Sequence, residues 1–285
     1  NTYRYSLYGS KESRLDFLFL EVEMKTVVLD LDGTMYRGSQ IIQSAKEFID
    51  YCLENKIPFI FLTNNAMRTR AQNVKHMLDM GYSGISSEQF FNSAMAACAY
   101  AKKQYSIKRA VYLGKDGLKE AMELSSIEYD PKHPQAVFVG LNKEATYQEY
   151  SQYLAYLLKG AKLIGTNKDR ILASPKGFEI GNGSIVKMFE YASNQISPDI
   201  GKPATPILDL CLDHFELDRN DILLVGDNLE TDIKLGQNTN IETVFVQTGV
   251  HTKEDIKRLN IHPTYVIDHL MELPALIFDH NNDTI

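Results

Sequence analysis

Two aspartates one residue apart, Asp30 and Asp32, follow an apolar run that ends at Leu29. In an extended chain residues i and i+2 point to the same side, so both carboxylates can face one crevice while Leu31 points into the core. Carboxylates this close stay ionised together only when a cation or hydrogen-bond donors neutralise them. Mg²⁺ suits such a place, because it takes hard oxygen ligands from carboxylates and substrate phosphate. The competing interpretation is that one aspartate caps a turn and the other is solvated.

A second pair of acidic residues, Asp227 and Asp232, follows another apolar run at residues 221–225. Asp227 stands at the end of that predicted strand, and Asp232 lies early in a predicted helix. Asp232 could therefore turn back towards an ion held by Asp227. The alternative is that both acids interact with the helix macrodipole, a functionally silent use of such residues.

A hydroxyl and an amide, Thr63 and Asn64, follow a third apolar run at residues 57–62, and a polar, basic helix is predicted over 68–80. A small hydroxyl that faces a helix N-terminus is well suited to bind a phosphate oxygen. Ordinary N-capping is the alternative for both residues. In the simplest parallel topology, one crossover connection places Thr63 beside the strand that carries Asp30.

Lys202, between Gly201 and Pro203, is a candidate phosphate-binding cation. We expect Pro203 to occupy the first position of a helix that runs to His214, which would stiffen the chain and aim the amine. The alternative is a solvated surface lysine, the ordinary state of this residue type.

All these residues require a sheet of buried parallel strands, because open α/β sheets bind ligands at the carboxyl ends of such strands. Strands and helices alternate along the chain, so we predict a doubly wound, Rossmann-like α/β core. The stretch 107–196 is too long for a loop, which predicts an inserted α/β cap domain. We therefore assign residues 25–106 and 197–285 to the core. Within the insertion we predict strands at 110–113, 136–139 and 162–164 and helices at 118–124, 147–159 and 184–191.

Composition narrows the function further. The chain has 285 residues, 30 basic and 37 acidic, and no Lys/Arg-rich block, which argues against nucleic acid or a membrane surface as a partner. The longest early apolar run, residues 15–20, is too short to span a membrane. The three cysteines of the chain are far apart in the sequence, so we expect reduced thiols and a cytoplasmic protein. We interpret residues 1–24 as an N-terminal extension outside the fold, with natural synthesis starting at Met24 as one explanation.

Two further segments, at residues 167–170 and 181–184, could also contact a ligand. The 181–184 run contains two glycines but lacks the Lys-Ser/Thr of a P-loop and the strand context of a dinucleotide motif, so we prefer a turn followed by a helix N-cap. For the polar turn at 167–170 we prefer a solvated loop to a lining of the site.

Four segments, in this order, resemble the motifs of the haloacid dehalogenase superfamily of aspartate-nucleophile phosphatases, and the resemblance spans residues 25–270. They are Asp-Leu-Asp-Gly-Thr at 30–34, Thr-Asn-Asn at 63–65, Gly-Lys-Pro at 201–203 and the acidic run at 226–232. The Thr-Asn-Asn form resembles the NagD-like, p-nitrophenyl phosphatase subfamily with a large C2-type cap. Three segments of the insertion share that likeness, at 139–141, 165–167 and 181–184.

The resemblance implies a role for each acidic residue. Asp30 is expected to be the nucleophile and a Mg²⁺ ligand, and Asp32 the general acid and base, with its backbone carbonyl on the ion. Asp227 is the expected side-chain ligand. Asn228 and Asp232 are expected to orient the ligands or a bound water rather than bind the ion.

Thr63, Asn64 and Lys202 are expected to bind the substrate phosphate. The implied activity is Mg²⁺-dependent hydrolysis of phosphate monoesters of small metabolites, such as sugar phosphates, nucleoside monophosphates and p-nitrophenyl phosphate, through an aspartyl-phosphate intermediate. Two alternatives remain on the same fold: a noncatalytic sensor of Mg²⁺ or a phosphorylated metabolite, and a phosphotransferase or phosphomutase. A homodimer formed through the cap is a family-level expectation.

Overall fold

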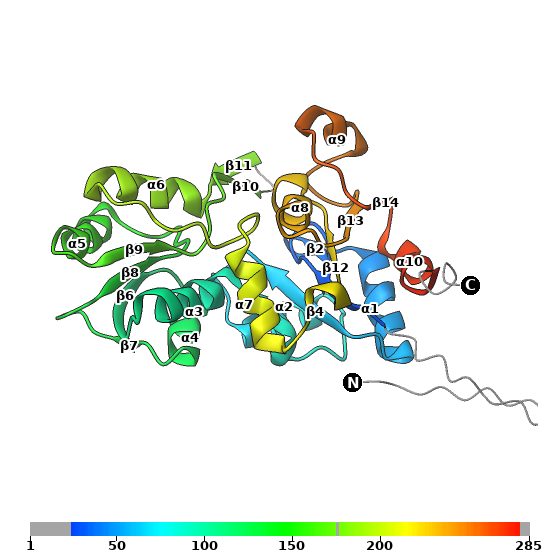
Figure 1. Cartoon of the computed structure of the whole chain (residues 1–285), viewed down its shortest axis with the longest axis horizontal. Helices are drawn as coiled ribbons and strands as arrows, with labels where there is room; N and C mark the ends of the chain where they lie inside the picture. Colours follow the sequence, from blue (N-terminus) through cyan, green and yellow to red (C-terminus); the bar gives the residue numbers. More distant parts are fainter. Residues whose placement is uncertain (1–23, 175–176, 280–285) are drawn as a thin grey trace, which may run out of the picture.

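The computed structural model describes residues 24–174 and 177–279. The predicted extension at residues 1–24 lies outside these ranges apart from Met24. Two α/β parts stand side by side, each built around its own parallel sheet (Figure 1). In the described ranges, none of the helices combines the length and the apolar character needed to cross a membrane.

The larger sheet has six parallel strands within the described residues, in the order β14-β13-β12-β1-β4-β5. Because β1 lies between β12 and β4, the strand ends that precede Asp227 and Asp30 and that contain Thr63 are neighbours. The predicted placement of Thr63 beside the first strand is therefore confirmed. The strands are β1 (Thr26–Leu29), β4 (Phe59–Thr63), β5 (Phe90–Asn92), β12 (Ile222–Gly226), β13 (Thr243–Val246) and β14 (Tyr265–Ile267).

Side chains of the central strands alternate between two hydrophobic layers, as expected for strands buried on both faces. Val27 and Leu29 of β1 pack with α1, α2 and α10, whereas Val28 packs with α3, α7 and α8. Helices on both faces make this sheet doubly wound, as predicted. The helices are α1 (Gln43–Asn55), α2 (Arg70–Asp79), α3 (Ser93–Tyr105), α7 (Pro206–Phe215), α8 (Lys234–Thr239), α9 (Lys253–Leu259) and α10 (Leu273–Asp279).

The smaller sheet has four parallel strands within the described residues, in the order β7-β6-β8-β9. Helices α5 and α6 pack on one face through Leu157 and Phe189, and α4 packs on the other through Leu118. The strands and helices predicted for the insertion are present. They are β6 (Arg109–Leu113), α4 (Asp116–Leu124), β8 (Ala136–Val139), α5 (Tyr147–Leu158), β9 (Lys162–Gly165) and α6 (Asn182–Ser193), to which the structure adds the short strand β7 (Glu128–Tyr129), which was not predicted.

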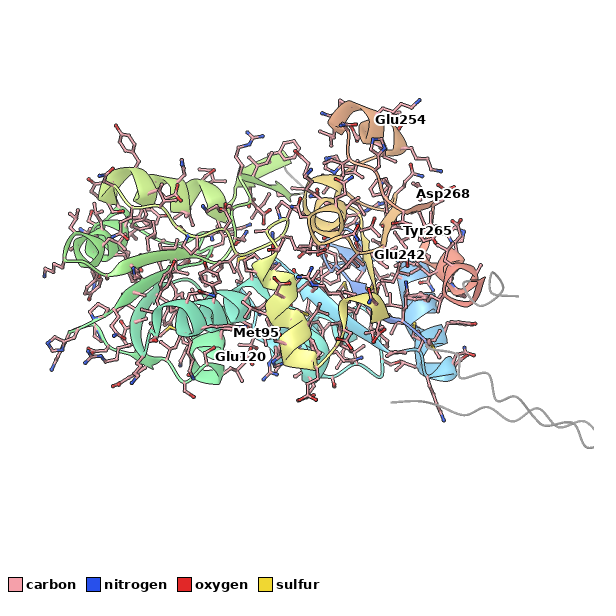
Figure 2. All side chains as sticks on the ribbon, in the orientation of Figure 1. Met95, Glu120, Glu242, Glu254, Tyr265 and Asp268 are labelled. Atoms are coloured by element: carbon pink, nitrogen blue, oxygen red, sulfur yellow. The ribbon has the colours of Figure 1, made fainter. Side chains whose placement is uncertain are left out.

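Helix α3 connects the two parts. It packs against α7 of the larger part and α4 of the smaller one, and one hydrophobic cluster runs from Val28 in β1 through α3 to Phe138 in β8. Figure 2 shows the side chains that fill this region, with Met95 of α3 and Glu120 of α4 labelled. The buried residues of α3 are mostly small, which permits close packing on both sides. They are Ser93, Ala94, Met95, Ala96, Ala97, Cys98 and Ala101.

Several local features differ from the prediction. The helix after Lys202 begins at Pro206 and not at Pro203, which lies in the preceding turn. Proline is tolerated at the first helical position, and the buried face of α7 begins only at Ile207, so Pro206 is the better start. Strand β5 and helix α3 occupy a stretch for which no element was predicted. An antiparallel hairpin, β10 (Ile171–Ser174) with β11 (Gly177–Ile180), joins β9 to α6.

Candidate active site

Polar side chains gather where three neighbouring strands of the larger sheet end. Asp30 follows β1, Thr63 ends β4 and Asp227 follows β12. The backbone N–H of Asp30 donates to the carbonyl of Val225 at 2.9 Å, which ties the end of β1 to β12. The carboxyl edge of a parallel sheet is where α/β proteins bind their ligands, so this edge is the candidate site.

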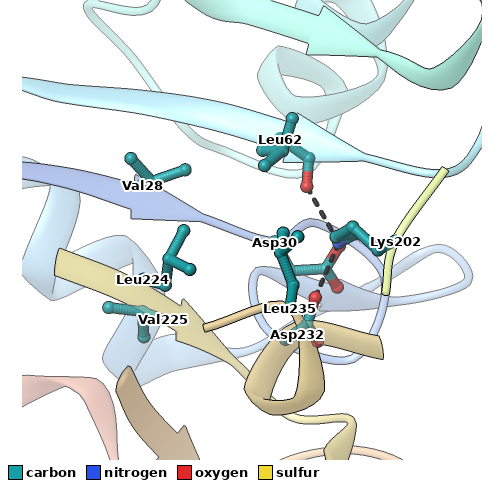
Figure 3. Close-up of a pocket in the computed structure, with 8 residues that line it drawn as sticks. All are labelled: Val28, Asp30, Leu62, Lys202, Leu224, Val225, Asp232 and Leu235. Carbon is teal, nitrogen blue, oxygen red and sulfur yellow. Dashed lines mark hydrogen bonds and ion pairs between the residues drawn. The ribbon is translucent and has the colours of Figure 1, made fainter. Parts of the chain in front are cut away.

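Three carboxylates and one ammonium form the centre of the site. Figure 3 shows Lys202 with two of the carboxylates, Asp30 and Asp232. One carboxylate oxygen each from Asp30, Asp227 and Asp232 lies within 4.8 Å of the others. The Nζ atom of Lys202 donates to Oδ1 of Asp30 at 2.5 Å and to Oδ1 of Asp232 at 2.7 Å. It also donates to the carbonyl of Leu62 at 3.0 Å. The Lys202 side chain is only 4% exposed, so the alternative of a solvated surface lysine is wrong.

Asp227 is fixed by donors from two loops. Oγ1 of Thr34 donates to its Oδ1 at 3.2 Å, and the backbone N–H of Val250 donates to its Oδ2 at 2.7 Å. A Cβ atom at Gly33 would lie 2.4 Å from Oδ2 of Asp227, and Gly33 has a φ of +93°, which favours glycine. The loop after β1 therefore approaches Asp227 this closely only because residue 33 is glycine.

Asp232 lies in a single turn of π-helix, Leu229–Ile233, that precedes α8. Its Oδ2 accepts from the backbone N–H of Asn228 at 3.2 Å. Oδ1 of Asn228 in turn accepts from the backbone N–H of Glu230 at 3.0 Å, so Asn228 caps the turn. Helix-end capping thus describes Asn228, whereas the carboxylate of Asp232 turns back towards Lys202.

The cluster holds more negative charge than Lys202 can neutralise. Burial raises the pKa of Asp30 to about 7, although the charge of Lys202 lowers it, and the charge of Asp232 raises it further. Burial, followed by the charges of Asp30 and Asp232, also raises the pKa of Asp227 well above its usual range. Burial disfavours the charged form of Lys202, but the charges of Asp232 and Asp30 outweigh it and raise the pKa of the lysine.

A divalent cation fits this donor set. The donors are hard carboxylate oxygens, and the raised pKa values of Asp30 and Asp227 reflect a repulsion that a bound cation would relieve. Asp30, Asp227 and Asp232 are the residues that could hold the ion, and among them Asp227 alone makes no hydrogen bond to the ammonium of Lys202.

The carboxylate of Asp32 is exposed to solvent, outside the buried cluster. Nδ2 of Asn65 donates to its Oδ2 at 3.3 Å. Protein atoms that exclude part of its water, followed by the charge of Asp30, raise the pKa of Asp32, while Asn65 and Arg68 oppose this rise. An exposed acid with a raised pKa, next to the buried cluster, can exchange protons with solvent and with a ligand bound there.

Thr63 and Asn64 have different surroundings. Thr63 is 2% exposed, and its Oγ1 accepts from the backbone N–H of Asn65 at 3.0 Å. The side chain of Asn64 bonds to the backbone of Lys202: Oδ1 accepts from the lysine N–H at 2.8 Å, and Nδ2 donates to the lysine carbonyl at 3.0 Å. Helix α2 is capped by Thr69, so the N-capping alternative is wrong for both residues.

The polar turn at residues 167–170 is only in part the solvated loop expected from the sequence, because Lys168 and Arg170 are exposed but Asn167 and Asp169 are not. Asn167 is 7% exposed, and Oδ2 of Asp169 accepts from Nδ2 of Asn64 at 3.0 Å, which brings the turn to the edge of the site. The reason is the position of the turn after β9, beside the loop that carries Gly201. The 181–184 run does form the predicted turn and helix start, with Gly181 before α6.

Sequence reasoning missed three contacts of the site. Thr34 and Asn65 are the last residues of two of the predicted motifs, and this position was the signal that could have identified them as site residues. The donor from residue 250 is a backbone N–H, which carries no side-chain signal in the sequence.

Comparisons with known proteins show a family likeness. A family model described as haloacid dehalogenase-like hydrolase matches residues 27–128, and a second, HAD-hydrolase-like model matches residues 199–273. An acid sugar phosphatase of Staphylococcus epidermidis is 37% identical over 240 residues, which cover 84% of this chain and 92% of the relative. An acid sugar phosphatase of Staphylococcus aureus is 35% identical over 254 residues, which cover 89% of this chain and 98% of the relative.

Solved structures show the same likeness. The crystal structure of a 4-nitrophenylphosphatase from Thermotoga maritima is 28% identical, with a TM-score of 0.82, and the match covers 90% of this chain and 98% of that one. A thermostable NPPase from Geobacillus stearothermophilus is 31% identical, with a TM-score of 0.78, and the match covers 87% of this chain and 97% of that one.

Proposed function

The chain belongs to the haloacid dehalogenase-like hydrolase family, and from this premise we propose that it is a Mg²⁺-dependent phosphatase of small phosphorylated metabolites. The observation that carries the proposal is the buried ammonium of Lys202 between Asp30 and Asp232, beside Asp227. This arrangement presents a carboxylate nucleophile and a positive charge at the same point. The names of the relatives make sugar phosphates and p-nitrophenyl phosphate the first substrates to test.

Asp30 and Asp227 would hold Mg²⁺ with their side chains, and Asp32 would hold it with its backbone carbonyl. When bound, the ion supplies positive charge to the phosphoryl oxygens and to the carboxylates. Asn228 and Asp232 keep the loop around Asp227 in place through the hydrogen bonds described above.

The residues of the chain then divide the chemistry between them. Lys202, Thr63 and Asn64 bind the substrate phosphate, Asn64 through its backbone N–H because its side-chain amide is engaged with Lys202 and Asp169, and this lowers the repulsion between the phosphate and Asp30. A carboxylate oxygen of Asp30 attacks phosphorus in line, the ester P–O bond breaks, and Asp32 donates a proton to the departing oxygen. Asp32 next takes a proton from water, the resulting hydroxide attacks phosphorus, and the bond to Asp30 breaks to release inorganic phosphate.

The two reacting aspartates need opposite protonation states at the start of a cycle. Asp30 must be ionised, and a bound cation together with Lys202 favours that form against the burial that raises its pKa to about 7. Asp32 must be protonated, and its raised pKa favours that form. Environments that give two neighbouring carboxyls different roles are a usual feature of acid–base catalysis.

We also propose that residues 107–196 form a cap that selects the leaving group, with the core in residues 25–106 and 197–285. The part of the chain around the smaller sheet faces the site through Asp169 and Asn167. A change of substrate preference after substitution in this part, without loss of Mg²⁺ dependence, is the expected behaviour.

The proposal is tested by Mg²⁺-dependent release of p-nitrophenol from p-nitrophenyl phosphate. We expect turnover by the wild type, loss of turnover in EDTA, and no turnover by Asp30→Asn, whereas Asp79→Asn, on the exposed surface of α2, should keep wild-type activity. Undiminished turnover by Asp30→Asn would refute the aspartyl-phosphate mechanism. Binding without turnover of any phosphorylated metabolite would favour the sensor, and transfer of phosphate to a second sugar without its release would favour the phosphomutase.

A further inference from the structure

The side chain of Asn64 holds the loop of Lys202 at two points. It accepts from the backbone N–H of Lys202 and donates to the carbonyl of the same residue, at 2.8 and 3.0 Å. Both backbone groups of the lysine are thus fixed by one amide. Because Nζ of Lys202 must meet Asp30 within hydrogen-bond distance, the position of this backbone decides where the ammonium lies.

The same amide has a third partner, which comes from the other part of the molecule. Nδ2 of Asn64 donates to Oδ2 of Asp169 at 3.0 Å as well as to the carbonyl of Lys202. An acceptor on this nitrogen fixes which end of the amide faces the lysine N–H. The carboxylate of Asp169 therefore strengthens the orientation in which Asn64 serves both backbone groups of Lys202.

Asp169 is itself held in place. Nδ2 of Asn167 donates to its Oδ2 at 2.5 Å, and Asn167 is anchored by the buried amide of Asn182, whose Nδ2 lies 3.2 Å from Oδ1 of Asn167 and 2.9 Å from the carbonyl of Val139. Asn182 is 1% exposed. The support of Asp169 thus reaches the end of β8 and the start of α6, which are rigid elements of the smaller part.

The two loops fit closely where they meet. A Cβ atom at Gly201 would lie 2.8 Å from Oδ1 of Asn64 and 2.8 Å from Cβ of Asn167. Little displacement of Asn64 is possible without moving the residue that precedes Lys202. Burial raises the pKa of Asp169, while the donors Asn167 and Asn64 and then the charge of Lys202 favour its ionised form.

We propose that Asp169 is a positioning residue for the phosphatase reaction: by fixing Asn64, it sets the backbone of Lys202 and hence the contact of the ammonium with Asp30. The inference rests on the proposed function, since it assigns Asp169 a part in that chemistry. The inserted part would then contribute to the reaction at the phosphate and not only to the choice of leaving group.

A purely structural role is the rival explanation, in which Asp169 fastens the two parts together. Asp199 offers a control, because its exposed carboxylate bonds to Lys168 at 2.7 Å and so fastens the same turn to the stretch that precedes Gly201 and not to Asn64. A loss of fastening should affect Asp169→Ala and Asp199→Ala alike and should appear in the unfolding temperature. A loss of positioning should affect kcat of Asp169→Ala alone.

The experiment compares Asp169→Ala, Asp169→Asn, Asn64→Ala, the Asp169→Ala/Asn64→Ala double variant and Asp199→Ala, with p-nitrophenyl phosphate at saturating Mg²⁺. We expect Asp169→Ala to lose about 10- to 100-fold in kcat, as for a hydrogen bond to a charged group, with KM changed less than about threefold. Asp169→Asn keeps an acceptor oxygen and should recover kcat to within about fivefold of the wild type. The double variant should match Asn64→Ala within about twofold, because residues that act as one unit are not additive.

Several results would overturn the proposal. They are a kcat of Asp169→Ala within twofold of the wild type, additive losses in the double variant, or an equal loss in Asp199→Ala. If the wild type releases no p-nitrophenol, the proposed function fails, and the inference is then judged on the affinity for inorganic phosphate with Mg²⁺, measured by calorimetry. In that assay Asp169→Ala should bind phosphate at least about tenfold more weakly than the wild type and Asp199→Ala, and equal affinities would overturn it.

Discussion

Lys202→Met tests the electrostatic arrangement of the site directly, because it removes the ammonium and keeps a side chain of similar length. The lysine side chain is 4% exposed, and its Nζ bonds to two carboxylates and the carbonyl of Leu62. Removing one partner from a buried ion pair typically costs about 3–5 kcal/mol, because the other charge stays buried and unpaired. We therefore expect the free energy of unfolding to fall by about 3–5 kcal/mol at pH 8 in EDTA.

The loss should be smaller at pH 5.5, and the sign follows from the pKa of Asp30. That pKa is about 7 in the folded protein, and the charge of Lys202 lowers it, so the variant raises it further. The unfolded-state value is about 4. A carboxyl whose pKa is raised by folding destabilises the fold progressively as the pH rises from the unfolded-state value through the folded-state value. At pH 5.5 Asp30 is protonated in the wild type as well as in the variant, so removing the ammonium leaves no unpaired charge on Asp30.

The assay is urea unfolding followed by circular dichroism at both pH values, together with kcat for p-nitrophenyl phosphate. We expect kcat to fall by about 100- to 1000-fold, the usual cost of removing a preorganised donor. The control is Lys75→Met, whose side chain is 75% exposed and pairs with Asp79 on α2. Surface pairs contribute about 0–1 kcal/mol, so the control should change stability by no more than that and leave kcat unchanged.

Two results would refute the reasoning. Wild-type stability of Lys202→Met at pH 8, with kcat reduced less than fivefold, would show that the lysine neutralises nothing of importance. An equal loss of stability at pH 5.5 and pH 8 would show that the effect comes from packing and not from the carboxylates around it.

Two further predictions concern the ion and the loop after β1. Mg²⁺ should raise the unfolding temperature of the EDTA-treated protein more at pH 8 than at pH 5.5, because protons compete for Asp30 and Asp227, whose pKa values burial raises. Scanning fluorimetry should show this rise in unfolding temperature, and Asp227→Asn should remove most of it. Gly33→Ala should cost about 3 kcal/mol of unfolding free energy in urea titrations and most of the activity, since its Cβ would lie 2.4 Å from Asp227. Gly38→Ala, at a position with a φ of +62° and no atom within 4 Å of an added Cβ, should lower the free energy of unfolding by only about 1–2 kcal/mol and leave kcat unchanged. Equal losses in the two variants would contradict the role of the close approach of Gly33 to Asp227.

The sheet and its polar edge could be predicted from the sequence because both depend on local patterns. Uninterrupted apolar runs before Asp30, Thr63 and Asp227 indicate buried parallel strands, and parallel strands bring their carboxyl ends to one edge. Chain order and crossover geometry then leave few topologies, so the position of Thr63 beside the strand of Asp30 follows from the sequence alone.

The contacts between the two parts could not be predicted in the same way. Asn64 and Asp169 are 105 positions apart, and nothing in either segment indicates the other. A polar turn such as 167–170 has the same composition whether it is solvated or packed against another loop, and the expected solvated state holds for Lys168 and Arg170 but not for Asn167. The predicted start of α7 was wrong for a related reason. Pro203 and Pro206 both fit the first turn of a helix, and the position of the buried face decides between them.

Helix α3 limits how this protein can be recombined with its relatives. Its small buried residues pack against both parts of the molecule, with α7 on one side and α4 on the other. A chimaera that takes residues 107–196 from a relative keeps α3 and α7 but replaces α4. A single larger residue on the incoming α4 would then overpack its contact with α3. With a crossover before Phe90, α3 moves together with α4, and the contact of α3 with α7 and the pairing of β5 with β4 have to be matched instead.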